Sequence, residues 1–320
     1  MRIWKRNLPA SAIFMLTAAI CTVYSMSASL WQPQINDSGT LYIVVTTTML
    51  SDLTREIAGD IACVTGLMGA GIDPHLYRAS AGDVAKMQEA DVVVYTGLHL
   101  EGRMGDVFQS LTKLGKTVIC VADGIAASEL IRDEDSSHSD PHIWFDVSMW
   151  KNAASKLAEG LCEADSENRA VYQENLKTYM LRLSELEQYI FRRISELDDN
   201  RRVLITAHDA FKYFGRAYGF EVIGLQGTNT NAEVGTYDVS ALAKLIAERK
   251  INAVFVETSV PAKNIEALAA AVRARGFDVT LGRELYSDSL GDSNSGHDTY
   301  IAAFRANVDT IVDTLKVCAA

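Results

Sequence analysis

The feature that most constrains the fold is a long stretch with the pattern of an amphipathic helix. From Asp165 to Leu197 the chain contains neither glycine nor proline. Apolar residues recur there in steps of three and four, the spacing of one helix face. They are Tyr172, Leu176, Tyr179, Leu183, Leu186, Ile190, Ile194 and Leu197. Such a helix is about 50 Å long at about 1.5 Å per residue. A helical hairpin or a coiled-coil segment is the alternative, but nothing in the stretch marks a turn. We therefore predict a rigid connecting helix over residues 165–199.

On both sides of this stretch, short apolar runs alternate with helical patterns. The predicted strands are Leu41–Thr46, Ile61–Leu67, Asp91–Thr96, Lys116–Val121, Arg202–Thr206, Glu221–Leu225, Asn252–Val256 and Asp278–Leu281. The predicted helices are Ser51–Ile57, Ser80–Ala90, Ala210–Tyr218, Val239–Arg249, one after Pro261, and Tyr300–Val317. This alternation predicts an α/β fold of two lobes, residues 30–164 and 200–320, each with a doubly wound parallel sheet. Ligands of such sheets bind outside the carboxyl ends of the strands.

Residues 1–29 have the pattern of a secretory signal. Arg2, Lys5 and Arg6 form a basic start, residues 10–24 carry no charge, and small residues follow. An uncleaved N-terminal membrane anchor is the alternative; a lipoprotein signal at Cys21 is weak because Ile20 before it is not small. Removal of this segment leaves 27 basic and 41 acidic side chains, a net charge of −14. Such a surface repels nucleic acid and anionic lipid and is compatible with attracting a cation.

The other four cysteines are scattered along the chain and form no CxxC pair. They are Cys63, Cys120, Cys162 and Cys318. Export would permit disulfides, but four cysteines allow three complete pairings and the sequence selects none of them. We expect buried apolar cysteines.

One short motif occurs twice. Residues 73–75 and residues 140–142 both read Asp-Pro-His, and two of the three prolines after residue 40 lie in these motifs. Proline fixes its own φ and extends the residue before it, and an aspartate side chain can bond nearby backbone N–H groups. The imidazoles of His75 and His142 are therefore expected on stiffened loops, which suits metal ligation.

A third histidine, His208, follows a predicted strand of the second lobe, so a cleft between the lobes could gather three imidazoles. A carboxylate would complete a set of four ligands, and spacing alone does not choose among four candidates. These are Asp288, Asp292, Asp298 and Glu257. Three nitrogens and one carboxylate, without a thiolate, suit zinc and are tolerable for manganese or iron(II).

Four ordered motifs resemble a known family, the TroA-like metal-binding proteins of zinc and manganese ABC importers. The motifs are Asp-Pro-His-x-Tyr around His75, Asp-Pro-His-x-Trp-x-Asp around His142, Thr-Ala-His-Asp-Ala-Phe-x-Tyr-Phe around His208, and Leu-Tyr-Ser-Asp-Ser-Leu around Asp288. The resemblance covers nearly the whole chain after the signal. It implies two α/β lobes joined by one long helix, with the metal between them on His75, His142, His208 and Asp288.

The resemblance also implies partners and leaves the metal open. It implies a periplasmic or extracytoplasmic protein that delivers its ion to a permease and a cytoplasmic ATPase; we expect a monomer that does not bind nucleic acid. Relatives with glutamate at the third position resemble manganese binders, whereas this chain has His208. Many zinc-specific relatives carry a long His-rich loop before the second motif. In this chain, residues 132–140 contain a single histidine, His138.

The remaining polar and aromatic candidates have ordinary structural explanations. We expect His99 to cap or pack at a helix start, and His138 and His297 to lie on the surface. Trp144 and Tyr213 are expected to pack around the site. Asp146 and Asp209 could either orient imidazoles or cap helices.

Two other functions fit parts of the sequence. A zinc hydrolase would use Glu257 as its general base, but HExxH and GxSxG motifs are absent from the sequence. A carrier of an organic ligand such as a siderophore would share the architecture, with a wide aromatic or arginine-lined cleft. Four protein ligands leave no vacant position for a reacting water, which favours carriage over catalysis.

Overall fold

The computed structural model describes residues 40–132 and 138–317. The predicted signal at residues 1–29 and Cys318 therefore lie outside the described residues. No helix in the described part of the chain is both long and apolar enough to cross a membrane.

The first lobe is built on a parallel sheet in the order β2-β1-β3-β4. Its strands are β1 (Leu41–Val45), β2 (Ala62–Gly66), β3 (Val92–Tyr95) and β4 (Thr117–Cys120), and its helices are α2 (Thr48–Ala58), α3 (Ala81–Glu89), α4 (Gly105–Lys113) and α5 (Val147–Ala164). Alternate residues of a strand face opposite sides of the sheet. Ile43 and Val45 pack in the core formed with α2 and α5, whereas Val44 packs with Met87 and Phe108 of α3 and α4. The doubly wound prediction is confirmed for this lobe.

The second lobe repeats the alternation with two parallel pairs, β5-β6 and β7-β8. Its strands are β5 (Val203–His208), β6 (Glu221–Gln226), β7 (Ala253–Glu257) and β8 (Thr280–Leu285), and its helices are α7 (Lys212–Tyr218), α8 (Thr236–Arg249), α9 (Lys263–Arg273) and α10 (Tyr300–Val317). Strands β5 and β7 lie beside each other. Val254 and Val256 of β7 face the α8 and α9 side, whereas Phe255 faces the larger core. Helices therefore cover both faces here too.

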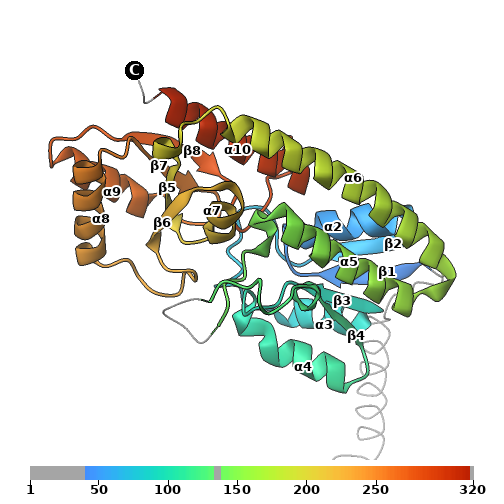
Figure 1. The fold of residues 1–320 in the computed structure, drawn as a ribbon. Helices are drawn as coiled ribbons and strands as arrows, with labels where there is room; N and C mark the ends of the chain where they lie inside the picture. The colour runs from blue at the N-terminus through green and yellow to red at the C-terminus, as the bar shows by residue number, and fades with distance from the viewer. Residues whose placement is uncertain (1–39, 133–137, 318–320) are drawn as a thin grey trace, which may run out of the picture. The chain divides into compact units, whose positions relative to one another are not determined.

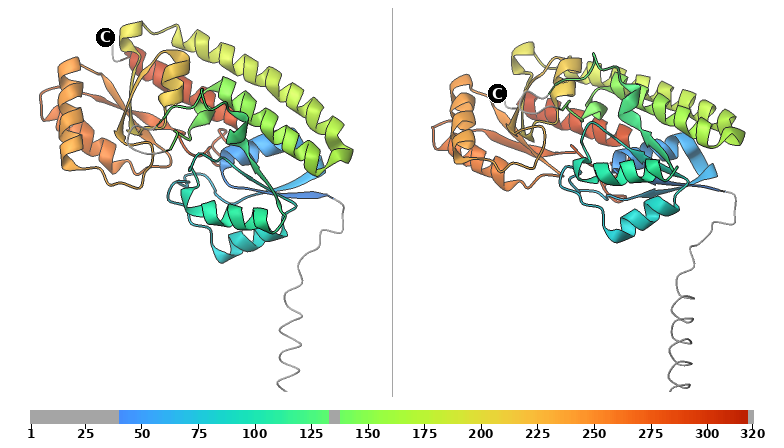
Figure 2. Two further views of the ribbon diagram at one scale, coloured as in Figure 1. Left: turned by 60° about the horizontal axis from the view of Figure 1, so that its bottom comes forward. Right: turned by 90° about the horizontal axis from the view of Figure 1, so that it is seen from below.

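The connecting helix is α6 (Arg169–Ile194), whose 26 residues span about 39 Å at about 1.5 Å per residue. It packs on α2 and α5 of the first lobe and on α10 of the second (Figure 1). It begins later than predicted, because Asp165 ends α5 and its side chain accepts a hydrogen bond from the hydroxyl of Tyr172, 2.7 Å away. Figure 2 shows the same course from two further directions.

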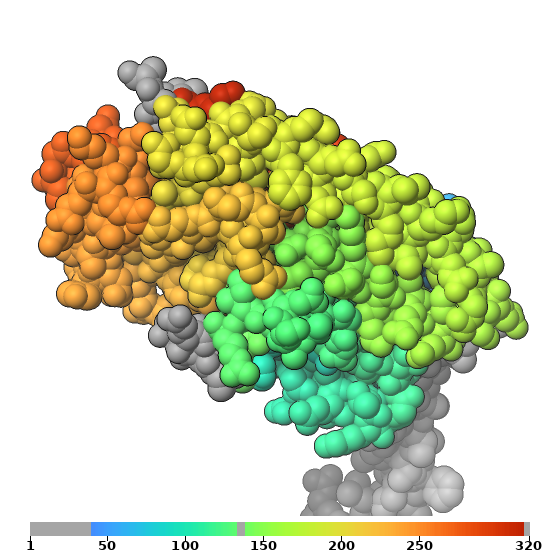
Figure 3. All heavy atoms as spheres, viewed as in Figure 1, coloured from blue at the N-terminus to red at the C-terminus, as the bar shows by residue number. Residues whose placement is uncertain are grey.

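The largest core cluster contains residues of both lobes and of the connector, including Leu50 of α2, Leu186 of α6 and Phe304 of α10. On the face drawn in Figure 3, the yellow atoms of the second lobe abut the green atoms of the first. The two lobes therefore share packed apolar surface.

The prediction for the cysteines is confirmed in part. Cys162 is buried, but Cys120 is half-buried and Cys63 is exposed on β2. These three cysteines are free.

Candidate metal centre

Four polar side chains from four separate loops or strand ends converge between the lobes. His75 lies on the loop after β2, and His142 immediately precedes the short 3₁₀ helix Ile143–Phe145. His208 is the last residue of β5, and Asp288 follows β8. These positions agree with the rule that ligands of parallel sheets bind outside the carboxyl ends of the strands.

The two Asp-Pro-His motifs form the same local structure. Oδ1 of Asp73 accepts the backbone N–H of His75 at 2.8 Å, and Oδ1 of Asp140 accepts that of His142 at 2.9 Å. The other oxygen of Asp73 accepts the hydroxyl of Thr230 from the second lobe, at 2.5 Å. The aspartates thus fix the direction in which each imidazole leaves the backbone, as the repeat predicted.

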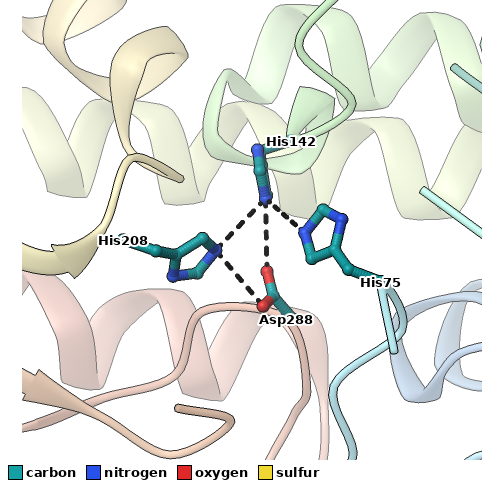
Figure 4. Close-up of side chains that lie close together, drawn as sticks. All are labelled: His75, His142, His208 and Asp288. Atoms are coloured by element: carbon teal, nitrogen blue, oxygen red, sulfur yellow. Dashed lines mark hydrogen bonds and ion pairs between the residues drawn. The ribbon is translucent and has the colours of Figure 1, made fainter. Parts of the chain in front are cut away.

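The ligand atoms of these side chains lie close together (Figure 4). Nε2 of His142 is 3.3 Å from Nε2 of His75 and 3.3 Å from Nε2 of His208. Oδ1 of Asp288 is 3.4 Å from Nε2 of His142, and its Oδ2 is 3.3 Å from Nε2 of His208. The edge of a tetrahedron is about 1.6 times its centre-to-corner distance, so zinc at about 2.0–2.1 Å needs edges of about 3.3–3.4 Å. These four separations fit this requirement, with Asp288 facing His142 through one oxygen and His208 through the other.

All four side chains are buried. His142 and His208 have no exposed surface, and the exposed fractions of His75 and Asp288 are 3% and 1%. Each residue offers one ligand atom, and these atoms all lie within 4.8 Å of one another. Oδ1 of Asp288 accepts no hydrogen bond from any residue that the structure describes. A buried carboxylate oxygen without a donor is costly unless a cation or a water molecule satisfies it. The group could therefore hold a metal ion.

Two further carboxylates contact the Nδ1 atoms of His142 and His208, on the opposite side of each ring from Nε2. Oδ1 of Asp140 lies 2.6 Å from Nδ1 of His142. Oε2 of Glu257 lies 2.6 Å from Nδ1 of His208, and its Oε1 accepts the backbone N–H of the same histidine at 2.9 Å. A carboxylate at Nδ1 keeps the proton of a neutral imidazole on that nitrogen, so that the lone pair of Nε2 points into the site.

The electrostatic environment separates the three histidines. Burial lowers the pKa of His75 to about 3. Burial also opposes protonation of His142, but Asp140 and Asp288 outweigh it and raise the pKa to about 9. His208 behaves alike, because Asp288 and Glu257 raise its pKa well above the usual value despite burial. For Asp288, burial favours the neutral form, but His208 and His142 hold the pKa well below its usual value.

These shifts favour positive charge on two of the imidazoles and negative charge on Asp288. A site that favours positive charge in this way, and whose donors are imidazole nitrogens and a carboxylate, suits a cation.

Of the four candidate carboxylates, Asp288 joins the imidazoles. Glu257 is buried but lies on the Nδ1 side of His208, and Asp292 and Asp298 are exposed. The segment of Asp288 is bonded to both lobes. Ser287 O accepts Nε1–H of Trp144 at 2.9 Å and Leu290 N donates to Oγ1 of Thr48 at 2.8 Å, whereas Tyr286 N donates to Oδ1 of Asn307 on α10 at 2.8 Å.

The remaining candidates lie outside the group. His99 adopts a left-handed backbone, φ 64°, and its ring packs against that of His138 with centroids 3.6 Å apart, so it does not cap a helix. His297 is half-buried, and its Nδ1 lies 3.1 Å from the hydroxyl of Tyr286. Asp146 caps α5 by accepting from the backbone of Ser148.

The other three side chains near the centre also have structural roles. Asp209 pairs with Lys212 at 2.9 Å and so does not orient an imidazole through that oxygen. Trp144 packs edge-on against the ring of His142, with centroids 5.2 Å apart. The hydroxyl of Tyr213 donates to the carbonyl oxygen of Asp140 at 2.9 Å. The expectation that Trp144 and Tyr213 pack around the site is confirmed.

Sequence reasoning missed the roles of Asp140 and Glu257 at Nδ1. The signal for Asp140 was present in its motif, two residues before His142. Glu257 is 49 residues from His208, and only the neighbouring positions of β5 and β7 bring them together. No local pattern could have identified that pair.

Comparison with known proteins agrees with the fold and the motifs. The model of the family "Zinc-uptake complex component A periplasmic" matches residues 43–314. The zinc-binding protein TroA of Treponema pallidum is 44% identical over 273 residues, covering 85% of this chain and 88% of that protein. The manganese-binding lipoprotein MntA of Bacillus subtilis is 41% identical over 276 residues, covering 86% and 90%.

A solved structure of the periplasmic zinc-binding protein TroA from Treponema pallidum superimposes with a TM-score of 0.84 at 43% identity. It covers 87% of this chain and 99% of that structure. The two-lobed α/β architecture with a long helix and the resemblance to the TroA-like proteins are thereby confirmed. The chain belongs to the family of zinc-uptake complex component A periplasmic proteins.

Proposed function

We propose that this chain is an extracytoplasmic solute-binding protein that captures one divalent transition metal ion, zinc, manganese or iron(II), and delivers it to an ABC importer. The observation that carries the proposal is the convergence of three imidazole Nε2 atoms and one carboxylate within 4.8 Å of one another, with Nε2 of His142 3.3–3.4 Å from the other three groups. The names of the relatives, a zinc-binding and a manganese-binding protein, support the same function.

His75, His142, His208 and Asp288 are the proposed ligands. The first two come from the first lobe and the others from segments of the second. The importer's permease and cytoplasmic ATPase are the proposed partners. Residues 1–29 act as an export signal or membrane anchor, residues 30–164 and 200–320 are the lobes on either side of the connector, and the chain works as a monomer.

The site geometry disfavours the two alternatives. A zinc hydrolase needs a base beside a metal-bound water, but Glu257 contacts Nδ1 of His208, on the far side of that ring from Nε2. An organic ligand would be held by side chains spread over a wide cleft, whereas the proposed ligand atoms all lie within 4.8 Å of one another in a buried group.

Calorimetry on metal-stripped protein with Zn²⁺ and with Mn²⁺ tests the proposal. We expect one ion per chain. His208→Ala should weaken binding by more than about 100-fold, above the loss usual for an outer partner of a ligand. His138→Ala is the matched control, since His138 lies outside the group of four, and should leave the affinity nearly unchanged. Equal losses in both variants would contradict the ligand assignment.

Measurable ester or peptide hydrolysis by the zinc-loaded protein would contradict carriage as its function. An ion stoichiometry well below one per chain with both metals would contradict metal capture itself.

A further inference from the structure

A cavity lies beside the proposed metal centre and shares one residue with it. The cavity has a volume of about 300 Å³, and His75 forms part of its wall. Other polar wall residues come from both lobes: His99 and Arg103 from the segment between β3 and α4, and Thr228 and Asn231 from the segment between β6 and α8. At about 30 Å³ for each water molecule, the cavity has room for about ten waters and therefore for a small ion with part of its hydration shell.

The cavity has a buried floor and an exposed rim. His75 is buried and Thr228 is 4% exposed, whereas His99, Arg103 and Asn231 are exposed. Oγ1 of Thr228 has no hydrogen-bond partner among the described residues. A buried hydroxyl without a partner is costly, so this group is expected to bond to whatever occupies the cavity.

The charge of the walls selects the kind of occupant. The chain has 41 acidic residues, but no acidic side chain in the described ranges lines this cavity. The nearby Asp73 and Asp140 each bond to the backbone N–H of the histidine two residues later. Arg103 brings a permanent positive charge to the rim. A cation would meet this charge and no carboxylate, whereas an anion would meet hydrogen-bond donors.

Hydrogen bonds hold Arg103 in place on both sides of the cavity. Glu101, two residues before it, is buried, and its Oε1 accepts from the hydroxyl of Thr46 at 2.6 Å and from the backbone N–H of Thr96 at 2.9 Å. From the second lobe, Oδ1 of Asn231 accepts from Nη2 of Arg103 at 2.8 Å. A guanidinium presents several N–H donors in a planar fork, so this bond orients the group and leaves donors for a ligand.

We infer that this cavity binds a small oxyanion, a carboxylate or a phosphate, with Arg103 and Thr228 as its main partners. The planar fork of an arginine matches two oxygens of either anion. A threonine hydroxyl can donate to an oxygen of the same anion from the buried floor. Because His75 belongs both to the cavity wall and to the proposed ligand set, the anion lies beside the bound cation, whose opposite charge favours it. This last step rests on the proposed function.

Inorganic phosphate and acetate test the inference on metal-free protein, where neither probe can coordinate a bound ion. Binding broadens the phosphorus NMR signal of phosphate and the carbon signal of labelled acetate, and titration gives each affinity. We expect acetate to displace phosphate, because both occupy the same cavity. The anion with the higher affinity identifies the class that the cavity prefers.

Two variants with matched controls locate the bound anion. Arg103→Gln should weaken both anions about tenfold or more, since it removes charge-assisted hydrogen bonds, and Thr228→Val should weaken them about fivefold. The controls are Arg78→Gln, at an exposed arginine of the first lobe outside the cavity, and Thr54→Val, at another buried threonine whose hydroxyl has no partner in the described ranges. Both controls should leave the affinities unchanged.

Zinc loading gives a readout that a chance surface site does not share. Acetate should bind severalfold more tightly to the zinc-loaded protein than to the metal-free protein, and by linkage it should raise the zinc affinity by the same factor. Arg103→Gln should lose this enhancement along with the anion.

Three results would overturn the inference and leave the proposed function standing. They are no binding of phosphate or acetate at millimolar concentration, equal losses in Arg103→Gln and Arg78→Gln, and an acetate affinity that zinc loading does not raise. A chain that binds these anions but takes up neither Zn²⁺ nor Mn²⁺ would overturn the proposed function alone.

Discussion

At His142 and His208 a metal ion must compete with protons for the imidazole nitrogen. Each of these histidines has one carboxylate at Nδ1 and another near Nε2, and both carboxylates favour the protonated ring. The pKa of His142 is raised to about 9 and that of His208 well above its usual value, so the surrounding carboxylates favour the protonated form of both imidazoles. A bound proton must leave before Nε2 can coordinate. If both histidines had the usual pKa of about 6.5, metal affinity would stop rising with pH just above neutral pH. Because their pKa values are raised, metal affinity should continue to rise at higher pH.

We therefore predict that metal affinity rises with pH across the whole range from about 6 to about 8. Each displaced proton contributes about tenfold in affinity per pH unit below its pKa, so the slope should be between about one and two. Calorimetry in buffers of different ionisation enthalpy measures both the affinity and the protons released. A plateau that begins near pH 7 would contradict the raised pKa values.

Glu257 is predicted to support binding without touching the ion. In Glu257→Gln the amide can place its NH₂ group against Nδ1 of His208, which favours the tautomer with the proton on Nε2 and blocks coordination. We expect the affinity for Zn²⁺ to fall about 10–100-fold while the fold persists. Glu284→Gln makes the same chemical change at an exposed position of β8 and should have no effect. Unchanged affinity in Glu257→Gln would show that the buried carboxylate is not needed.

At the scale of elements, α6 depends on one buried face. Leu183 is fully buried in the main core, whereas Leu181, two residues earlier on the same helix, is 63% exposed. Leu183→Ala should lower the free energy of unfolding by about 2–5 kcal/mol, because it leaves a cavity where the lobes meet the connector. Leu181→Ala should change it by no more than about 0.5 kcal/mol. Denaturant titration of the metal-free protein measures both values, and equal losses would contradict the packing of α6.

Elements with strong local patterns could be predicted from the sequence. The capping box of Ser80 and Asp83 is present at α3, and α10 has the predicted bounds. Helix α5 was not predicted, although its buried residues recur in steps of three and four at Val147, Trp150, Ala154, Leu157 and Leu161. Its Gly160 is favoured by tertiary structure, since a Cβ there would lie 2.5 Å from the side chain of Ile119 on β4.

Two other elements were also misjudged. Helix α4 begins at Gly105 without a side-chain cap, so nothing local marks its start. Strand β8 was predicted at residues 278–281 but spans Thr280–Leu285, because the exposed charged residues Arg283 and Glu284 hide its second half.

The residues of the site also differ in how far the local sequence could identify them. His75 and His142 were found because their motif repeats and fixes each ring locally. The contact between Ser259 and Asp288 joins residues 29 positions apart through the neighbouring strands β7 and β8. Sequence patterns therefore identify the proposed ligands better than they identify the groups that position them.

At the scale of the whole described unit, the two lobes are joined by more than the connector. The segment that carries Asp288 follows a strand of the second lobe, yet it bonds to the first lobe through Thr48, Gly71 and Trp144. The N-terminus of α10 is held in the same way, because Asp52 of α2 accepts the backbone N–H of Tyr300 at 2.9 Å. Separation of the lobes would break these hydrogen bonds and expose the shared core.

We therefore predict that metal release involves small lobe motions and local loop rearrangement. A packed helix resists hinge bending better than flexible strands do. Small-angle scattering of metal-free and metal-loaded protein should give radii of gyration within about 1 Å of each other, the scale of backbone shifts in pre-organised binding. Thr48→Val, which removes the acceptor of Leu290 N at nearly constant volume, should loosen the Asp288 segment and speed metal release without a larger change in radius. A change of several ångströms on loading would instead mean that the lobes open as rigid bodies and that the buried bonds between them break in each transport cycle.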